Sequence, residues 1–298
     1  MNTYKILIKR NVKLFFKDKG MFITSLITPM ILLVLYGTFL GKIYRESFLS
    51  AFPKGLGVSK DIINGLVGGQ LLSSILAVSC VTVAFCSNFL MVQDKASSRI
   101  KDLTISPVKS SVLSVSYYIA TLFSTLIICF AALLLCLGYV YFEGWYLSAK
   151  DVVLLFTDVL LLVLFGTALS SLINLFLSTQ GQISAVGTII SSCYGFISGA
   201  YMPIANFNKG LQKVLSFLPG TYGTSLLRNH ATRGAIAQLV KSGVPKEIAT
   251  EIKNSLDCNV KFFGSIVKIP TMYCILAFAV IIIMAIYILL NAVKSKKN

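Results

Sequence analysis

The stretch IINGLVGGQLLSSILAVSCVTVAFCSNFLMV, residues 62–92, contains no charged side chain and is apolar along most of its length. A helix of about 20 mainly apolar residues can cross the roughly 30 Å hydrocarbon core of a bilayer. The stretch is therefore long enough to form a transmembrane helix. Its Gly68 and Gly69 are small residues of the kind that let neighbouring helices approach closely.

Four further stretches share this character, and together they predict an all-α polytopic membrane protein. Three of them lack charge entirely and the fourth contains one acidic residue, Asp158; they cover residues 21–41, 110–142, 269–293 and 152–208. The last is too long for one helix and divides at the polar turn Ser178–Gln182. We therefore predict a single transmembrane domain with six membrane-spanning helices, at residues 21–41, 66–92, 111–137, 152–177, 183–202 and 270–293.

The overall composition excludes an ordinary soluble protein. Hydrophobic residues make up 56% of the chain, charged residues only 13%, and the mean hydropathy is +0.81. The net charge of +16 does not indicate a nucleic-acid partner, because the basic residues flank the apolar stretches, where they set topology. Six of the seven cysteines fall within apolar stretches, so no disulfide framework is expected, and a single histidine, His230, argues against a metal site.

Basic residues also predict the orientation of the chain. The segment 1–20, the loop between the second and third spans, and the tail after residue 293 together hold 13 of the 27 Lys and Arg. Short loops rich in Lys and Arg stay in the cytoplasm. We therefore expect both termini to be cytoplasmic.

The segment 1–20 is predicted to form an amphipathic helix in the inner membrane interface. Apolar and basic residues occupy opposite faces at 100° per residue: Tyr4, Leu7, Ile8, Val12 and Phe15 on one, and Lys9, Arg10, Lys13 and Lys17 on the other. The pattern fits either a simple topology anchor or a helix that helps to receive a cytoplasmic partner.

The inner loop 93–110 carries an apolar stripe at helical spacing, formed by Ala96, Ile100 and Leu103, which Pro107 ends. A solvated loop would need no such stripe. We therefore predict a short helix that docks a partner.

The segment 203–269 is predicted to be re-entrant and extracellular. Two short apolar helices, broken at Pro219-Gly220, are expected to dip into the outer leaflet and return. Pro245 then precedes a helix whose Ile248, Ile252 and Leu256 share one face, which predicts a small extracellular cap.

The chain contains no recognisable source of energy for transport. It lacks a Walker-type phosphate loop, and Asp158 is the only ionisable residue within the spans. We expect Asp158 to cap its helix or to snorkel to the interface, with a role in transport as the alternative. Uphill transport would then require another subunit. Gly195 and Gly199 form a small-xxx-small pair that predicts close helix packing.

Six spans, an amphipathic N-terminal helix and a helical first inner loop together resemble permeases of the ABC-2 type, the membrane subunits of type V ABC exporters. In that family the inner loop carries an acidic residue, then Gly-Thr, then a Leu and a Pro. Here Asp94, Leu103 and Pro107 follow this order, while Ser98-Arg99 stand in place of Gly-Thr.

A second signature of the family lies at the end of the fifth span. It consists of Gly199–Pro203, then Leu218–Tyr222, then Arg228. The detailed sequence of both signatures is similar to that of the multidrug and haemolysin branch of the family.

The resemblance implies a division of labour between subunits. Two permease chains would pair, as a homodimer or with a similar chain, in a bacterial cell membrane, and two ATPase subunits would bind ATP and Mg²⁺; this chain would bind no cofactor itself. Coupling to the ATPase would involve Asp94, Lys95, Arg99, Leu103 and Pro107. The family motif of the re-entrant segment would comprise Gly199, Pro203, Pro219, Tyr222 and Arg228.

An exporter of an amphipathic, drug-like or lipid-like substrate, such as a toxin, pigment or drug, is the function expected from these observations. Alternatives are export of polysaccharide, teichoic acid or sodium by the same class of permease, a stand-alone channel or secondary carrier, and a membrane sensor or assembly factor.

Overall fold

The computed structural model describes residues 2–51, 58–100, 108 and 110–297. Leu103 and Pro107 of the predicted docking helix lie outside these ranges. The elements, in chain order, are α1 Asn2–Lys17, α2 Lys19–Leu35, the π-helical turn η1 Tyr36–Leu40, α3 Gly41–Ala51, α4 Lys60–Ala96, α6 Ser110–Glu143, α7 Ala149–Asn174, α8 Gln180–Ile197, the 3-10 turn η2 Ile204–Asn206, α9 Lys209–Leu215, α10 Pro219–Lys241, α11 Lys246–Ser255, β1 Lys261–Phe262, β2 Ser265–Ile266 and α12 Ile269–Lys297.

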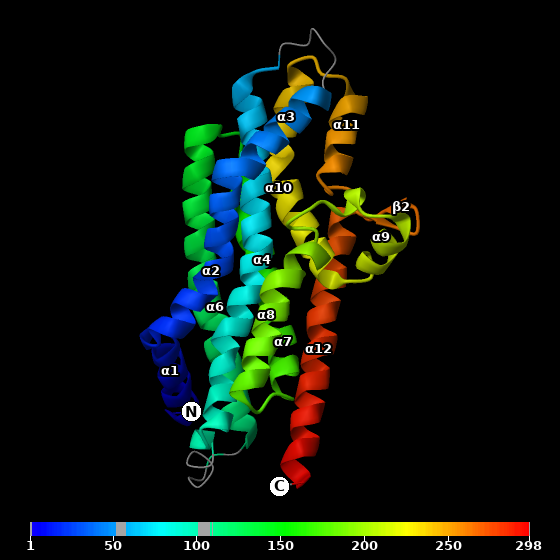
Figure 1. Cartoon of the computed structure of the whole chain (residues 1–298). Helices are drawn as coiled ribbons and strands as arrows, with labels where there is room; N and C mark the ends of the chain where they lie inside the picture. Colours follow the sequence, from blue (N-terminus) through cyan, green and yellow to red (C-terminus); the bar gives the residue numbers. More distant parts are fainter. Residues whose placement is uncertain (1, 52–57, 101–107, 109, 298) are drawn as a thin grey trace.

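The long helices run side by side and form one elongated bundle (Figure 1). We call the end that carries both termini in Figure 1 the lower end, and the opposite end the upper end. α4 and α7 descend to the lower end, whereas α8 runs back upward and α12 descends again. The two termini therefore lie at the same end of the bundle, as an even number of passes requires.

Five helical stretches within the described residues are long and apolar enough to cross a membrane. They are Lys19–Ser50, Lys60–Ala96, Ser111–Glu143, Ala149–Asn174 and Ile269–Asn291. The predicted fifth span, residues 183–202, differs. Its helix α8 ends at Ile197, includes polar side chains such as Ser184 and Thr188, and does not qualify by length and composition, although it runs along the bundle. The all-α polytopic fold is confirmed, but five stretches qualify instead of the six expected.

Local capping explains where several helices begin. The side chain of Ser148 caps α7, and the side chain of Asp151 accepts a hydrogen bond from the backbone N–H of Ser148, which completes a capping box. Thr179 and Gln182 form the same arrangement at the start of α8. The predicted break at Ser178–Gln182 is therefore real, because Thr179 starts a new helix within it. The first span is longer than expected, since helical backbone continues from α2 through the π-helical turn η1 into α3.

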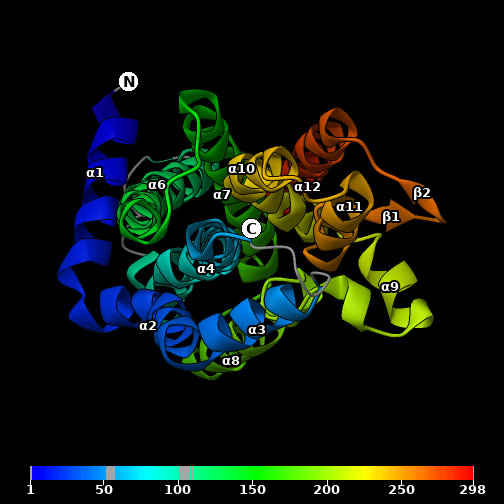
Figure 2. The same cartoon turned by 90° about the horizontal axis from the view of Figure 1, so that it is seen from above.

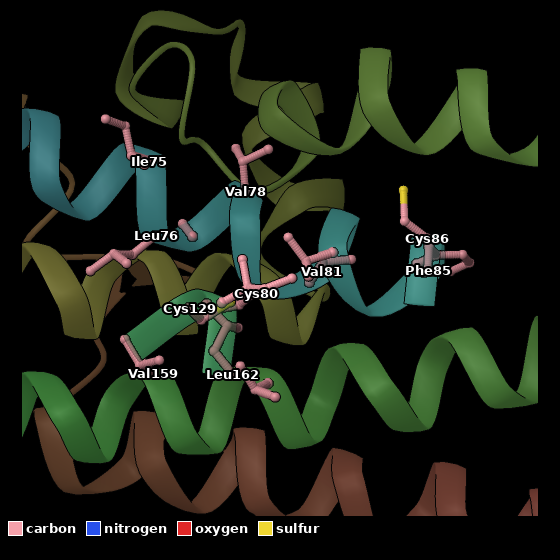
Figure 3. Close-up of a cluster of buried hydrophobic side chains, with 14 of the residues drawn as sticks. Ile75, Leu76, Val78, Cys80, Val81, Phe85, Cys86, Cys129, Val159 and Leu162 are labelled. Carbon is pink, nitrogen blue, oxygen red and sulfur yellow. The ribbon is translucent and has the colours of Figure 1, made fainter. Parts of the chain in front are cut away.

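The helix α4 occupies the centre of the bundle. Figure 2 shows it between α2, α3 and α8 on one side and α6, α7 and α10 on the other. All residues in the most apolar 18-residue stretch of α4 are buried, whereas only 11% of the corresponding stretch of α12 is buried. In Figure 3, Cys80 of α4 lies close to Cys129 of α6, with Val159 and Leu162 of α7 packed beside them. All seven cysteines are free thiols.

Glycines set the closest approaches to α4. A Cβ atom at Gly69 would lie 2.7 Å from the carbonyl oxygen of Ala231 in α10, and one at Gly68 would lie 3.2 Å from Val140 in α6. From the other side, a Cβ at Gly166 of α7 would lie 2.6 Å from the carbonyl oxygen of Cys80. The packing role predicted for Gly68 and Gly69 is therefore confirmed.

The segment between α8 and α12 differs from the prediction in its second half. The break at Pro219 exists, but the residues after it do not form a short return helix. They form the 23-residue α10, which packs against α4, α7 and α12 and rises to the upper end. His230 of α10 pairs with Asp158 of α7, whereas Arg228 binds Gly199 and Asp257, and the sequence pattern alone could not indicate these partners. The expected cap helix exists as α11, with Ile252 and Leu256 buried.

The close approach at Gly69 gives a first prediction. Gly69→Val should force α10 away from α4, and overpacking of this kind costs about 1–3 kcal/mol. We expect a lower melting temperature of the purified protein in detergent and less monodisperse material. Gly138→Val is the matched control, because a Cβ there meets nothing within 4 Å. Equal melting temperatures for the two variants would contradict the packing at Gly69.

Candidate functional site

A charged cluster at the lower end joins three helices through the carboxylate of Asp94. Asp94 lies near the end of α4 and is fully buried. Its Oδ2 accepts a hydrogen bond from Nη1 of Arg10 in α1 at 2.8 Å and another from the hydroxyl of Tyr117 in α6 at 2.5 Å. A buried charge needs such partners, because leaving it unpaired costs about 3–5 kcal/mol. The cluster therefore fixes α1 against α4 and α6.

Two arginines balance the charge of Asp94. Burial lowers the pKa of Arg10, but the hydrogen bond to Asp94 and its negative charge together raise the pKa by more than burial lowers it. The pKa of Arg10 therefore lies above its ordinary value, and the guanidinium is charged. Nη1 of Arg99, just after α4, lies 3.7 Å from Oδ1 of Asp94, and the Arg99 side chain is 61% exposed. Arg99 is thus the member of the cluster that an external surface can reach most easily.

Lys95, the neighbour of Asp94, binds the end of another helix. Its Nζ donates to the backbone carbonyl oxygens of Asn174, Leu175 and Leu177 at 3.0, 3.3 and 3.4 Å. The last carbonyls of a helix lack partners within the helix and carry partial negative charge. Lys95 therefore caps the lower end of α7.

The residues predicted to couple the chain to an ATPase thus differ in whether they face the protein interior or the surface. Asp94 and Lys95 turn inward and bind helices of the same chain, Arg99 is exposed, and Leu103 and Pro107 are outside the described residues. Asp94 and Lys95 are therefore placed to act within the chain, and Arg99 is the member of this set that lies at the surface. Arg10 and Tyr117 lie 84 and 23 positions from Asp94, and the carbonyls that bind Lys95 lie 79 to 82 positions from it, beyond the reach of local pattern.

Ser98 stands where the ABC-2 pattern has Gly, and its backbone conformation is one that favours Gly. Ser98 follows the C-cap residue Ser97 and has a φ of 58°, in the left-handed region. Glycine adopts this conformation freely, whereas other residues do so at a cost. The ABC-2 pattern has Gly where this chain has Ser98, so the chain keeps the backbone turn without the residue that favours it.

The second motif forms a lock around Arg228, whose side chain is fully buried in α10. Its Nη2 donates to the carbonyl oxygen of Gly199 at 2.6 Å, and its Nη1 lies 3.2 Å from Oδ2 of Asp257. The same carboxylate accepts hydrogen bonds from the backbone N–H groups of Ile204 and Ala205. The lock therefore joins the end of α8, the turn after it, α10 and the segment after α11.

Backbone conformation explains why Gly199 occupies its position. Its φ of +75° ends α8, and a Cβ there would lie 2.9 Å from Ile204. Asp257 was missed by sequence reasoning. A signal existed, since Asp257 is a single acid between apolar Leu256 and Cys258. Burial raises the pKa of Asp257, while Arg228 and the backbone N–H groups lower it, and the net pKa lies above its usual value.

The remaining motif residues lie in the connection from α8 to α10 and in the first turn of α10. Pro203 precedes η2, Pro219 is the first residue of α10, and the hydroxyl of Tyr222 donates to the carbonyl oxygen of Ser216 at 2.5 Å. The small-xxx-small prediction fails here. Gly195 is covered by the ring of Tyr201 from the same turn, and Gly199 terminates the helix, so neither serves a contact between two membrane helices.

Asp158 belongs to a buried polar group that sequence reasoning did not assemble. Its Oδ2 lies 2.6 Å from Nδ1 of His230 in α10, and its Oδ1 accepts a hydrogen bond from the hydroxyl of Tyr273 in α12. Asp158 is 2% exposed and Ser148 already caps α7, so the expected capping or snorkelling is wrong. The sequence singled out Asp158 within a predicted span and His230 as the single histidine, but their pairing across 72 positions was decided by the tertiary structure.

A groove lies between α2–α3 and α8. It encloses about 1270 Å³ and reaches from Asp18 near the lower end to Asn206 after α8. α4 contributes Cys86, Phe89 and Gln93 to its back wall. Among the residues that the structure describes, no group of three or more His, Cys, Asp or Glu could hold a metal ion.

These features define a polytopic, all-helical membrane protein with charged links at both ends of its bundle. A comparison with protein families matches residues 2–230 to the family described as ABC-2 type transporter. The match covers most of the chain, so the chain belongs to the ABC-2 type transporter family. Neither the curated proteins nor the solved structures yielded a match. The matched range includes Asp94 and Arg228 and ends before Asp257.

The left-handed backbone at Ser98 gives the second prediction. Ser98→Gly should stabilise the chain by about 1 kcal/mol, because the conformation costs roughly 1–2 kcal/mol for a residue with a Cβ and glycine loses some additional entropy on folding. Thermal unfolding of the purified protein measures the change. Ser97→Gly is the control, because Ser97 has an ordinary φ of −88° and should gain nothing. A melting temperature of Ser98→Gly at or below that of the parent chain would refute the assignment.

The third prediction concerns the buried polar group. Asp158→Leu leaves His230 and Tyr273 without their acceptor, and an unsatisfied buried polar group costs about 1–3 kcal/mol. We expect a clearly lower melting temperature for Asp158→Leu and a smaller decrease for Asp158→Asn, which keeps an acceptor oxygen. Thr157→Leu, at an exposed neighbouring position, serves as control. If Asp158→Leu melted like the parent chain, the polar group would not hold these helices together.

Proposed function

We propose that this chain is the permease subunit of an ATP-driven exporter that moves amphipathic, drug-like or lipid-like molecules out of the cell. The groove between α2–α3 and α8 carries this proposal, because it offers a continuous path of about 1270 Å³ along the bundle. A toxin, pigment or drug with an extended apolar portion would fit such a path.

The lining of the groove favours an amphipathic substrate over an ion or a glycan. Apolar side chains such as Ile31, Leu35 and Phe89 form most of its wall, with hydroxyl groups of Ser184 and Thr188 at intervals. Ligand sites of this kind bind apolar surface and use a few polar groups for orientation. Sodium would need a cage of oxygen ligands and a glycan a mainly polar wall, whereas most of the surface of this wall is apolar.

A second permease subunit is part of the proposal. The exposed face of α8 contains Ser184, Thr188, Ser192 and other small residues, which lipid chains solvate poorly. Small and hydroxyl-bearing residues are typical of contacts between membrane helices. Two copies of the chain, facing each other across α2 and α8, would cover these faces and enclose a shared passage.

Energy would come from two separate ATPase subunits, which would bind ATP and Mg²⁺, at the lower end. This end combines the exposed basic face of α1 with Arg99. With the lower end in the cytoplasm of a bacterial cell, as the positive-inside rule predicts, both termini and the docking surface would meet a cytoplasmic ATPase.

The Asp94 cluster would carry motion from the ATPase into the bundle. A push on α1 or on the residues after α4 would reach α4 and α6 together, since Arg10 and Tyr117 share the Asp94 carboxylate. α4 in turn forms the back wall of the groove. Asp94 would thus act as an internal link, and Arg99 as a surface contact.

The fourth prediction tests this coupling by a double-mutant cycle. The chain is purified with its ATPase from native membranes, and substrate-stimulated ATP hydrolysis is measured in proteoliposomes for Arg10→Gln, Asp94→Asn and the double variant. Coupling contributions of about 0.5–2 kcal/mol predict losses of stimulation from about twofold to thirtyfold. The double variant should lose little more than either single variant, because both remove one interaction.

Lys150→Gln is the matched control, since Lys150 is an exposed basic residue at the start of α7, at the upper end and away from the proposed docking surface. It should retain stimulation. Full stimulation in all three cycle variants would refute the coupling role of Asp94. Vectorial transport by the chain alone, without any ATPase, would refute the proposed function as a whole.

A further inference from the structure

A small lobe projects from the side of the bundle below α11, and only its first half lies within the family match (Figure 1). We call the residues 209–217 and 261–268, which form α9 and the β1–β2 hairpin with their ends, the lateral lobe. Its second half lies beyond residue 230, where the match to the ABC-2 type transporter family stops. Figures 1 and 2 show α9 and the hairpin projecting sideways from the bundle, beside the start of α12.

Three phenylalanines meet on the surface of this lobe. The ring centroids of Phe217 and Phe262 are 5.2 Å apart, those of Phe217 and Phe263 5.7 Å, and those of Phe262 and Phe263 4.8 Å. Phe217 and Phe263 are nevertheless 61% and 66% exposed. Apolar side chains around them are exposed as well: Leu211, Val214 and Ile266. A contiguous exposed apolar patch of this kind marks an interaction surface.

The backbone of the hairpin is arranged so that an aromatic ring occupies its tip. Phe263 and Gly264 connect the two strands, and both have positive φ, 47° and 88°. Two residues with positive φ match the type I′ turn of tight hairpins. A bulky residue such as Phe is rare in this conformation and costs energy there. Although this conformation is costly, the turn leaves most of the Phe263 ring exposed, where it can contact the surroundings of the chain.

The charge of the lobe selects the partner. The lobe contains Lys209, Lys213, Lys261 and Lys268, all exposed, and no Asp or Glu. The acidic residues nearest in sequence are Asp257, which is held by Arg228, and Glu251 in α11. Phenylalanine and lysine side by side are typical of segments that bury apolar side chains below the headgroups and bind anionic lipid with their basic groups.

The position of the lobe matches the edge of the membrane. Val267 and Lys268 alone separate β2 from α12, whose apolar stretch Ile269–Asn291 is long enough to span the bilayer. Two extended residues bridge less than about 10 Å. The hairpin is therefore held beside the upper boundary of the hydrocarbon, and its sideways projection takes it over the surrounding lipid instead of over the bundle.

We propose that the lateral lobe is a lipid anchor, in which Phe217, Phe262 and Phe263 insert into the upper leaflet and the lysines bind anionic headgroups. The anchor holds the segment between α8 and α12, which contains the Arg228–Asp257 lock, at a fixed depth. This inference requires only that the bundle spans a membrane, and it does not depend on the ATPase partner or on the substrate.

The test uses the fact that the chain has a single tryptophan, Trp145. Phe263→Trp is made in a Trp145→Phe background, and the full chain is reconstituted into vesicles of phosphatidylcholine and phosphatidylglycerol. Lipids brominated on shallow positions of their acyl chains should quench most of the Trp emission, and aqueous iodide should quench little. Phe217→Trp in the same background is a second probe, should the first variant fail to fold.

Two control positions calibrate the measurement in the same background. Leu135→Trp, at a 76% exposed position of the span α6, should be quenched by brominated lipid. Thr250→Trp, at an exposed position of α11, should be quenched by iodide. A lobe probe that follows the Thr250 pattern would place the lobe in water and overturn the anchor. A probe quenched by neither agent would show that a second protein surface covers the lobe, which would equally overturn it.

The charge component has its own measurement. With only one of the two lipids brominated at a time and equal amounts of each, brominated phosphatidylglycerol should quench the Phe263→Trp probe more strongly than brominated phosphatidylcholine. Lys209→Gln, Lys213→Gln and Lys261→Gln combined should remove this difference while leaving the total quenching in place. Equal quenching by the two lipids in the parent probe would refute the binding of anionic headgroups.

Discussion

The architecture depends on the close packing of other helices around α4. A helix surrounded by protein within a membrane must satisfy its polar groups internally. In α4 the hydroxyl groups of Ser73, Ser79 and Thr82 bond to carbonyls of their own helix, so they leave the surface free for packing. Gly69 then allows α10 to reach backbone contact, and Gly166 of α7 allows the same on another side. Because α4 is buried all round, a change on any of its faces is transmitted to a neighbour.

The charged links of the bundle follow from the same constraint. Among the described residues, four buried carboxylates are each paired with a group distant in sequence: Asp94 with Arg10, Asp151 with Arg233, Asp158 with His230, and Asp257 with Arg228. An unpaired charge in these places would be costly, so each pair fixes the relative position of the two segments that it joins. α4 links these pairs, since it carries Asp94 at its lower end and packs against α10, which carries Arg228 and His230. Packed protein therefore connects the lower end of the bundle with α10 through α4.

Two exposed surfaces of the described residues differ in their chemistry. The exposed face of α8 has hydroxyl groups and small side chains beside an apolar groove, which fits a second copy and a substrate. The lateral lobe has aromatic rings and lysines, which fit a lipid surface. The two surfaces thus differ in composition as the proposed contacts with a second copy and with lipid require.

The sequence by itself determined the elements that depend on local pattern. Long charge-free stretches required membrane helices, opposite apolar and basic faces required the amphipathic α1, and Pro219 and Thr179 marked true helix starts. Tertiary structure alone decided which residues meet. Lys95 caps α7, Asp158 joins His230 and Tyr273, and Asp257 completes the Arg228 lock, each across 29 to 115 positions of sequence. It also decided that the polar α10 is buried. Burial of polar residues depends on partners supplied by distant helices, and a pattern of hydrophobicity along one segment contains no information about those partners.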